Sequence, residues 1–242
     1  MAERSNIEWT DATWNPWYGC EEVSPGCDHC YARREMERYG RPWKVTRSKT
    51  KFTEPLTWTM PKIVFTCSWS DWFHDEADAW RGDAWRVIEQ CPEHTFLILT
   101  KRTGRIERHL PWSAFGDPWP NVWLGTSVEN QDTAFRVRQL RAVPAAVRFI
   151  SAEPLLGPLA LDLSGIHWLI AGGESGPGFR PMELDWARTL RDACVGAGVA
   201  FFLKQLGGWP DKRGGESALL DGKRWTERPG ARAPDARTEQ PE

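Results

Sequence analysis

The chain has 242 residues, with 31 basic against 33 acidic side chains and six cysteines. This length is enough to bury one substantial hydrophobic core, and the even charge balance excludes a globally basic nucleic-acid binder while leaving room for a local basic patch. The first residues form no apolar stretch, and no apolar run approaches the length of a bilayer-spanning helix, so we expect a cytoplasmic protein with no membrane partner.

The first informative segment, residues 15–33, contains three cysteines in a C-x6-C-x2-C pattern: Cys20, Cys27 and Cys30. In a reducing cytosol, clustered cysteines are expected to be metal ligands rather than disulfides. The two-residue gap lets one turn direct Cys27 and Cys30 at the same centre, and Gly26 permits a tight backbone approach. Because no fourth cysteine lies nearby, three thiolates would leave one coordination position open, which is typical of a reactive metal centre rather than a structural one.

Short apolar runs alternate with helical patterns along the rest of the chain. The runs predict parallel strands buried on both faces, at residues 62–67, 95–100, 121–125, 147–151, 167–171 and 199–203, with an added strand near Thr13 and Trp14. A helix is expected at residues 28–39, ended by Gly40. Three more are expected where apolar residues recur on one helical face: Ala77, Trp80, Ala84, Ile88 and Cys91; Ala134, Val137 and Leu140; and Leu184, Ala187, Leu190 and Cys194. Gly198 is expected to end the last of these helices. Repeated β–α units predict an α/β fold, a partial or closed (β/α) barrel of six to eight parallel strands.

The domain organisation follows from the same patterns. Residues 1–228 are expected to form a single barrel domain, with the cysteine loop near its amino end and a hairpin at residues 219–225 around Asp221 and Gly222. Residues 229–242 mix proline, alanine, arginine and acids, which predicts a disordered tail.

The predicted strands are apolar, but the residues that follow them are polar. In parallel barrels the reactive groups lie at the carboxyl ends of the strands, so we expect these side chains to converge on one mouth. The candidate binding residues are Ser70, Asp71, Lys101, Arg102, Ser127, Glu129 and Glu174, and the same strand ends carry Ser68, Asn130, Glu153, Ser175, Lys204 and Gln205. Lys101 and Arg102 could bind a carboxylate or a phosphate, or form a surface ion pair.

Several of these features have a purely structural interpretation. The glycine-rich loop at residues 172–178 could cradle a carboxylate, ribose or phosphate, or its glycines could serve only to make a turn. The basic residues of segment 41–52, which also contains Trp43 and Phe52, suit a phosphate backbone and unstacked bases, or simply a solvated loop. The remaining cysteines, Cys67, Cys91 and Cys194, are interpreted as buried small hydrophobes.

The cysteine segment and the polar strand ends also resemble known protein families. Gly-Cys followed by Gly-Cys-x-x-Cys-Tyr-Ala-Arg, at residues 19–20 and 26–33, resembles the cluster loop of radical S-adenosylmethionine (SAM) proteins, in particular the spore photoproduct lyase-like branch. From Trp14 to about Trp225 the chain is also similar to a phage and prophage family of three-cysteine-motif proteins of undefined role, through residues 14–20, 68–71, 125–130, 151–157, 172–176 and 204–207. Two departures from the radical SAM pattern are the longer gap after Cys20 and the presence of His29, instead of an aromatic residue, before Cys30.

The resemblance implies a specific chemistry. Cys20, Cys27 and Cys30 would hold a [4Fe–4S] cluster whose open iron binds SAM, and reductive cleavage of SAM would start hydrogen abstraction from an unknown substrate. Ser70, Asp71, Ser127, Glu129 and Glu174 are candidate SAM contacts. An electron donor is then required, a separately encoded partner protein is a further candidate, and the phage setting with the basic segment favours a nucleic acid or nucleotide substrate.

Two alternatives stay open. The chain could be a non-catalytic module that binds nucleic acid or protein and is stabilised by metal, with zinc at the three cysteines and a fourth ligand such as His29 or His74. It could also keep an iron–sulfur cluster but lack SAM chemistry, because the departures in the loop affect SAM binding more than cluster binding.

Overall fold

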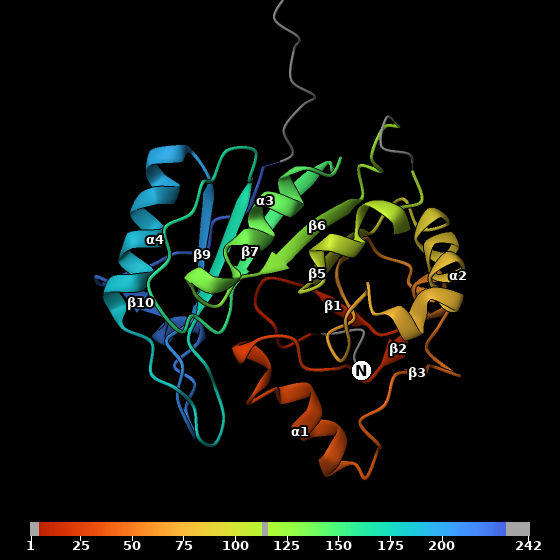
Figure 1. The fold of residues 1–242 in the computed structure, drawn as a ribbon, viewed down its shortest axis with the longest axis horizontal. Coiled ribbons are helices and arrows are strands. Elements are labelled where there is room, and N and C mark those ends of the chain that lie inside the picture. The colour runs from red at the N-terminus through yellow and green to blue at the C-terminus, as the bar shows by residue number, and fades with distance from the viewer. Residues whose placement is uncertain (1–4, 113–115, 231–242) are drawn as a thin grey trace, which may run out of the picture.

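The structure, a computed structural model, describes residues 5–112 and 116–230. Its centre is a seven-stranded sheet in the order β1-β4-β5-β6-β7-β8-β9, in which every neighbouring pair is parallel. The sheet curves into an open half-barrel (Figure 1). The predicted α/β class and strand number are confirmed, and the partial form of the predicted barrel is the one compatible with this sheet, since its two edge strands, β1 and β9, do not pair with each other.

The strands lie where the sequence predicts them, six of them in the apolar runs and β1 near Thr13 and Trp14. They are β1 (Ala12–Trp14), β4 (Ile63–Thr66), β5 (Thr95–Thr100), β6 (Val122–Ser127), β7 (Val147–Ala152), β8 (Trp168–Gly172) and β9 (Ala200–Gln205). Every residue of β8 is buried, as expected for a central strand covered on both faces.

Four α-helices accompany the sheet in the described part of the chain: α1 (Tyr31–Arg38), α2 (Asp78–Glu89), α3 (Phe135–Arg141) and α4 (Leu184–Ala197). In Figure 1, α2 and α4 flank the sheet at opposite sides, α3 lies over β6 and β7, and α1 stands apart below them. Gly198 adopts a left-handed conformation, with φ +66°, and ends α4 as predicted. The first helix is shorter than predicted, because residues 25–27 form a separate 3-10 turn and α1 begins only after Cys30.

Short elements complete the fold. β2 (Trp17–Tyr18) pairs with β3 (Thr46–Arg47), and β10 (Leu219–Leu220) pairs with β11 (Lys223–Arg224), both antiparallel. The second pair confirms the predicted hairpin, with positive φ at both Asp221 and Gly222, as a two-residue turn of this type requires. Of the predicted tail, residues 231–242 lie outside the described residues. Within residues 5–112 and 116–230, no helix combines the length and the apolar character needed to cross a bilayer.

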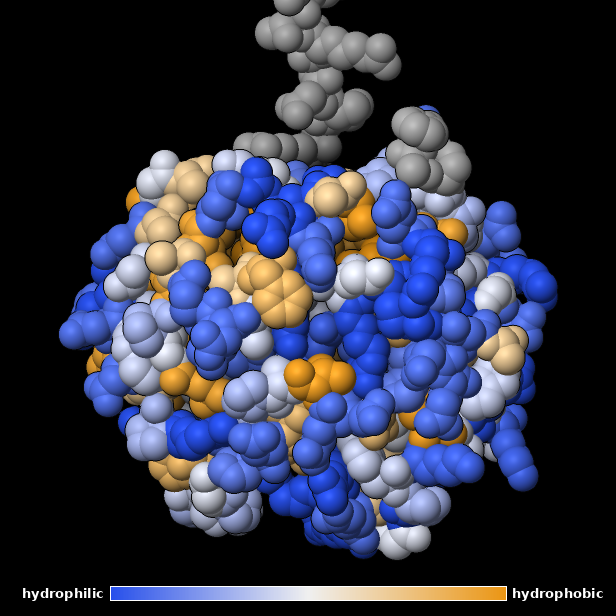
Figure 2. Space-filling model, viewed as in Figure 1, coloured by the Kyte–Doolittle hydropathy of each residue, from blue (hydrophilic) through white to orange (hydrophobic). Residues whose placement is uncertain are grey.

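Two groups of buried side chains pack on the two faces of the sheet. The larger one fills the space between the sheet and the helices, and the smaller one fills the concave face and consists of Trp9, Phe65, Leu97, Phe149, Trp168, Ile170 and Phe202. Gly125 in β6 makes room for this inner core, since a Cβ atom there would lie 2.3 Å from the Phe149 ring. The outer surface in Figure 2 is mostly hydrophilic, with hydrophobic residues interspersed among polar ones.

Candidate functional site

A cavity of about 390 Å³ lies at the carboxyl end of the half-barrel. Cys20, Cys27 and Cys30 all line it. So do polar residues at or just after successive strands: Ser68, Ser70 and Asp71 after β4; Thr100, Lys101 and Arg102 at β5; Ser127 at β6; Ser151 and Glu153 at β7; Ser175 after β8; and Lys204 and Gln205 at β9. The expected convergence of polar strand ends is therefore observed, and apolar side chains including Trp9 and Phe65 also line the cavity.

The cysteine loop reaches the cavity through a compact turn. The amide of Cys27 donates to the carbonyl of Ser24 over 2.8 Å, and the amide of Cys30 donates to the carbonyl of Cys27 over 3.2 Å. Helix α1 begins directly afterwards at Tyr31, whose hydroxyl donates to the carbonyl of Ser68 over 2.6 Å. All three thiols are unpaired and half-buried, so they are available as ligands.

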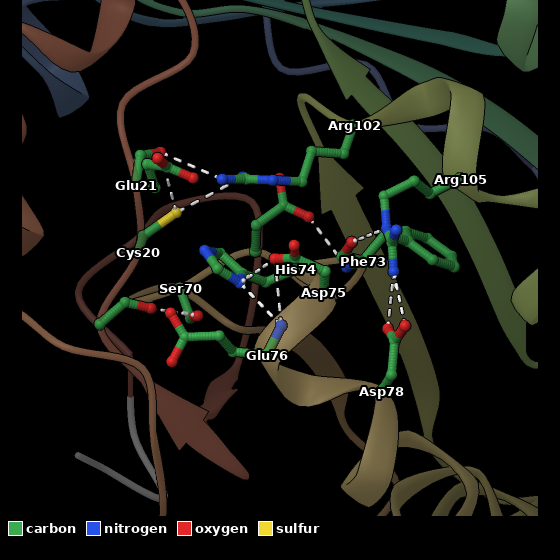
Figure 3. A network of polar contacts seen from close by, with 12 residues as sticks. Cys20, Glu21, Ser70, Phe73, His74, Asp75, Glu76, Asp78, Arg102 and Arg105 are labelled. Carbon is green, nitrogen blue, oxygen red and sulfur yellow. Dashed lines mark hydrogen bonds and ion pairs between the residues drawn. The ribbon is translucent and has the colours of Figure 1, made fainter.

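Arg102 connects Cys20 to the end of β5 (Figure 3). Its guanidinium donates to the Cys20 Sγ over 3.6 Å and to the Glu21 carbonyl over 3.2 Å, and it lies 3.4 Å from the Asp71 carboxylate. Burial, with a smaller effect from Asp71, raises the pKa of the Cys20 thiol to about 11, while Arg102 opposes the shift. The free Cys20 is therefore a neutral thiol at pH 7, and a metal must displace its proton.

Two of the candidate binding residues near Arg102, Asp71 and Ser70, form hydrogen bonds with other parts of the fold. Asp71 is buried and accepts hydrogen bonds from the Thr100 hydroxyl at 2.7 Å and the Lys101 amide at 2.9 Å. Ser70 donates to the carbonyl of Gly19 over 2.5 Å. Both residues line the cavity, but these bonds make them positioning groups for β5 and for the segment that leads to Cys20.

Glu129 holds the cysteine loop from the side of β6. It is fully buried, and its carboxylate accepts from the Ser24 hydroxyl at 2.8 Å and from Arg136 at 3.0 Å. Lys101 lies 3.4 Å from the same carboxylate. A Cβ atom on Gly26 would lie 2.6 Å from the Glu129 Cγ, so the loop backbone rests directly on this side chain.

Glu174 holds the same loop from the side of β8. Its carboxylate accepts from Arg180 through the backbone amide at 2.8 Å and through the guanidinium, and the His29 Nδ1 lies 2.9 Å from it. Arg180 also donates to Asp28 at 3.0 Å and to the Pro25 carbonyl at 2.8 Å. Glu129 and Glu174 lie beside the cavity rather than among its lining residues, and their role as SAM contacts stays a prediction.

The glycines of the 172–178 loop serve close backbone contacts. A Cβ atom on Gly173 would lie 2.2 Å from the Leu206 carbonyl oxygen, and one on Gly176 would lie 2.5 Å from the Arg34 guanidinium. These contacts favour the structural interpretation of the glycines, although Ser175 in the same loop lines the cavity.

The three cavity cysteines are not the closest-spaced group of potential metal ligands in the described part of the chain. Among residues 5–112 and 116–230, the one group of three potential ligands whose ligand atoms all lie within 4.8 Å of one another is Cys91, Glu93 and His94. A tetrahedral zinc ion with Zn–S bonds of about 2.3 Å would hold its sulfurs closer than about 4 Å. Cys20, Cys27 and Cys30 do not form such a group in the described part of the chain, so they are not arranged around a single zinc ion, and thiolates are also the ligands that hold iron–sulfur clusters.

The histidines proposed as a fourth zinc ligand have other contacts. His29 binds Glu174, and the Nδ1 of buried His74 accepts from the Glu76 amide at 3.2 Å (Figure 3). A further thiol is present instead, since Cys67 lines the cavity although it is buried as predicted. Cys67 has a left-handed backbone, with φ +55°, a conformation that costs energy for any residue with a Cβ atom.

The basic segment 41–52 is partly structural. The guanidinium of Arg47 lies 3.8 Å over the ring of buried Phe52, and Lys51 pairs with Glu54 at 2.5 Å. Phe52 is thus a core residue and not a platform for a base. Trp43 differs, because it lines the cavity.

Several residues at the site were not identified from the sequence, among them Arg180, Lys212 and Ser151. Arg180 joins Glu174 to the cysteine loop, and no local pattern predicts this role because its partners in the loop, Asp28 and Pro25, are 152 and 155 positions away in the chain. Lys212 and Ser151 line the cavity, and Ser151 could have been found by its position at the end of a predicted strand.

Comparisons with known proteins add one finding. A family model described as "Protein of unknown function (DUF5131)" matches residues 4–229. No curated protein and no solved structure matches the chain.

Proposed function

We propose that this chain, which belongs to the DUF5131 family, is a radical SAM-like iron–sulfur protein that cleaves S-adenosylmethionine reductively and abstracts hydrogen from a bound substrate. One observation carries the proposal: Cys20, Cys27 and Cys30 line the same cavity as the polar ends of successive parallel strands. In parallel barrels this is the end at which reactive groups lie. The setting implied by oxygen-sensitive chemistry and by six unpaired cysteines is the reducing cytoplasm.

Cys20, Cys27 and Cys30 are the residues that would hold the [4Fe–4S] cluster. When bound, the cluster supplies an electron and an open iron position for the amine and carboxylate of SAM. The hydrogen bond from Arg102 to the Cys20 sulfur is the kind of contact that tunes such a group.

The remaining cavity residues have roles in binding and in excluding water. Lys101 and Lys204 bring positive charge to the lining, each close to a carboxylate, Glu129 and Glu153 respectively. Cations there suit the carboxylate of SAM or a phosphate of the substrate. Trp9 and Phe65 of the inner core are part of the lining, and apolar side chains there disfavour water beside a reactive intermediate.

Trp43 supports a nucleotide or nucleic acid as the substrate class. Its half-buried indole belongs to the basic segment 41–52 and lines the cavity, and the face of an aromatic ring can stack on an unpaired base. The proposed reaction would also require an electron donor, and a separately encoded partner protein is a further candidate.

Metal analysis tests the cluster. Protein purified and reconstituted without oxygen is expected to be brown, with roughly three to four irons per chain, as a [4Fe–4S] site requires. Each of Cys20→Ala, Cys27→Ala and Cys30→Ala should lose this iron, whereas the control Cys194→Ala, on α4 away from the cavity, should keep it. Colourless protein with zinc retained at the three cysteines would overturn the assignment.

A second candidate function rests on the contacts of Glu129 and Glu174. Because these two of the five predicted SAM contacts are engaged with the cysteine loop, the chain could bind a cluster without SAM chemistry. Incubation of the reconstituted protein with dithionite and SAM decides between the two. Formation of 5′-deoxyadenosine supports the enzyme, and its absence with several reductants supports the non-catalytic cluster protein.

A further inference from the structure

The turn that connects α2 to β5 carries a second group of potential metal ligands. The amide of His94 donates to the carbonyl of Cys91 over 3.2 Å, which closes a tight turn across Pro92 and Glu93. This turn precedes β5 at Thr95, whereas the cavity residues Thr100 to Arg102 lie at the other end of the same strand. The two places are therefore separated by the full length of β5, roughly 17 Å.

His94 is a buried side chain without hydrogen bonds. It is 0% exposed, and neither ring nitrogen has a hydrogen-bond partner among the described residues. The ring contacts the aromatic rings of Trp58 and Phe96, with centroid distances of 5.6 and 6.2 Å. A neutral imidazole has one donor and one acceptor, so complete burial leaves both unsatisfied unless something else binds them.

The neighbouring side chains supply the rest of a ligand set. The Cys91 sulfur, a Glu93 carboxylate oxygen and a His94 nitrogen all lie within 4.8 Å of one another. The Glu93 oxygen is 3.6 Å from the His94 Nε2, too far for a hydrogen bond but close enough to share an ion. Cys91 and His94 have the two-residue spacing with which one turn directs two ligands at a single centre.

We propose that Cys91, Glu93 and His94 bind one zinc-type divalent ion. A thiolate and an imidazole select a borderline ion over Mg²⁺ or Ca²⁺, which prefer oxygen ligands alone. Cys91 and His94 are buried while Glu93 is 45% exposed, so the ion would enter from the surface at Glu93. Three protein ligands leave one position for water or an external ligand.

This assignment revises the interpretation of Cys91 as a helix-face hydrophobe. Helix α2 ends at Glu89, two residues before Cys91, because Pro92 disfavours a helical conformation in the residue that precedes it. Cys91 thus belongs to the turn and shares it with His94. The bound ion would fix the connection between α2 and β5.

Cobalt binding tests the proposal without interference from the cavity. The full chain with Cys20→Ser, Cys27→Ser and Cys30→Ser, stripped of metal by a chelator, is titrated with Co²⁺. One Co²⁺ per chain is expected, with a thiolate-to-cobalt charge-transfer band. The result is independent of the proposed function, because the three cavity cysteines are absent from this background.

Variants in that background identify the ligands. Cys91→Ser should abolish the band, and Glu93→Gln, on an exposed side chain, should weaken Co²⁺ binding by at least about tenfold. Cys194→Ser, which removes another buried thiol, should leave the band unchanged. Zinc should raise the melting temperature of the background protein but not of its Cys91→Ser form.

Two results would overturn the site. One is a background protein that binds no stoichiometric Co²⁺, and the other is a charge-transfer band that survives Cys91→Ser. Circular dichroism checks that each variant is folded. If Cys91→Ser does not fold, Glu93→Gln decides, and unchanged affinity in that variant counts against the proposal.

Discussion

At the scale of single residues, the cysteine loop is positioned by one glycine and one buried acid. Gly26 rests on Glu129, and Glu129 in turn is held by Ser24 and Arg136. The sequence indicates that Gly26 allows a tight backbone approach. It does not identify the partner, because Ser24 and Glu129 are 105 positions apart and nothing local links them.

Replacement of Gly26 tests this contact. In Gly26→Ala the new methyl group would lie 2.6 Å from the Glu129 Cγ, and the buried, ion-paired Glu129 has little room to move. We expect a loss of about 1–3 kcal/mol in the free energy of unfolding, measured by urea denaturation, together with reduced iron loading.

The matched control is Gly82→Ala on α2. A Cβ atom on Gly82 meets nothing within 4 Å, and alanine is the better helix former. This variant should gain about 0.5–1 kcal/mol. Equal stability of the two variants would show that Gly26 does not rest on Glu129.

At the scale of elements, local sequence patterns were sufficient to predict where the strands lie. They were insufficient to predict which loops contact one another. The apolar runs predicted six of the seven strands of the main sheet, because a buried strand has a signature within its own few residues, and the seventh, β1, lies at the added strand predicted near Thr13 and Trp14. The clamp of Glu174 and Arg180 on the cysteine loop has no such signature. It joins residues 28–29 to residues 174–180, and only the folded sheet brings these loops together.

The clamp gives a pH-dependent contribution to stability. Burial raises the pKa of Glu174, but hydrogen bonds from Arg180 and His29 outweigh this effect and hold it below its ordinary value of about 4.5. A lowered pKa in the folded state stabilises the fold above the ordinary value, and this stabilisation is lost as the pH falls through the lowered pKa. Glu174→Gln should therefore cost about 1.5–3 kcal/mol at pH 7 and progressively less below pH ~4.

Unfolding of wild type and variant across pH 3–7 checks this expectation. Glu89→Gln on the exposed part of α2 serves as the control and should differ little from wild type at every pH. If the difference between wild type and Glu174→Gln stayed constant down to pH 3, the carboxylate charge would not be the source of the stabilisation.

At the scale of the whole molecule, the sequence predicted a partial or closed barrel, and the structure is a half-barrel with a filled concave face. Strand patterns do not encode closure, because closure depends on whether the edge strands β1 and β9 meet. Trp9 precedes β1 and packs on the concave face against Phe65, with a centroid distance of 4.7 Å, and edge-on against Trp168. An indole thus occupies the interior and leaves the cavity only at the carboxyl end of the strands.

Removal of this indole should affect both the fold and the cavity. Trp9 is 2% exposed, so Trp9→Ala leaves a void in the inner core and should lower the free energy of unfolding by about 3–5 kcal/mol. Because Trp9 also lines the cavity, the void should open to solvent there, and iron in the reconstituted variant should be lost faster in air. Met60→Ala, at a residue 66% exposed, is the control and should change stability by less than about 0.5 kcal/mol. A Trp9→Ala protein as stable as this control would mean that the inner core does not depend on Trp9, and the half-barrel would need another explanation for its filled concave face.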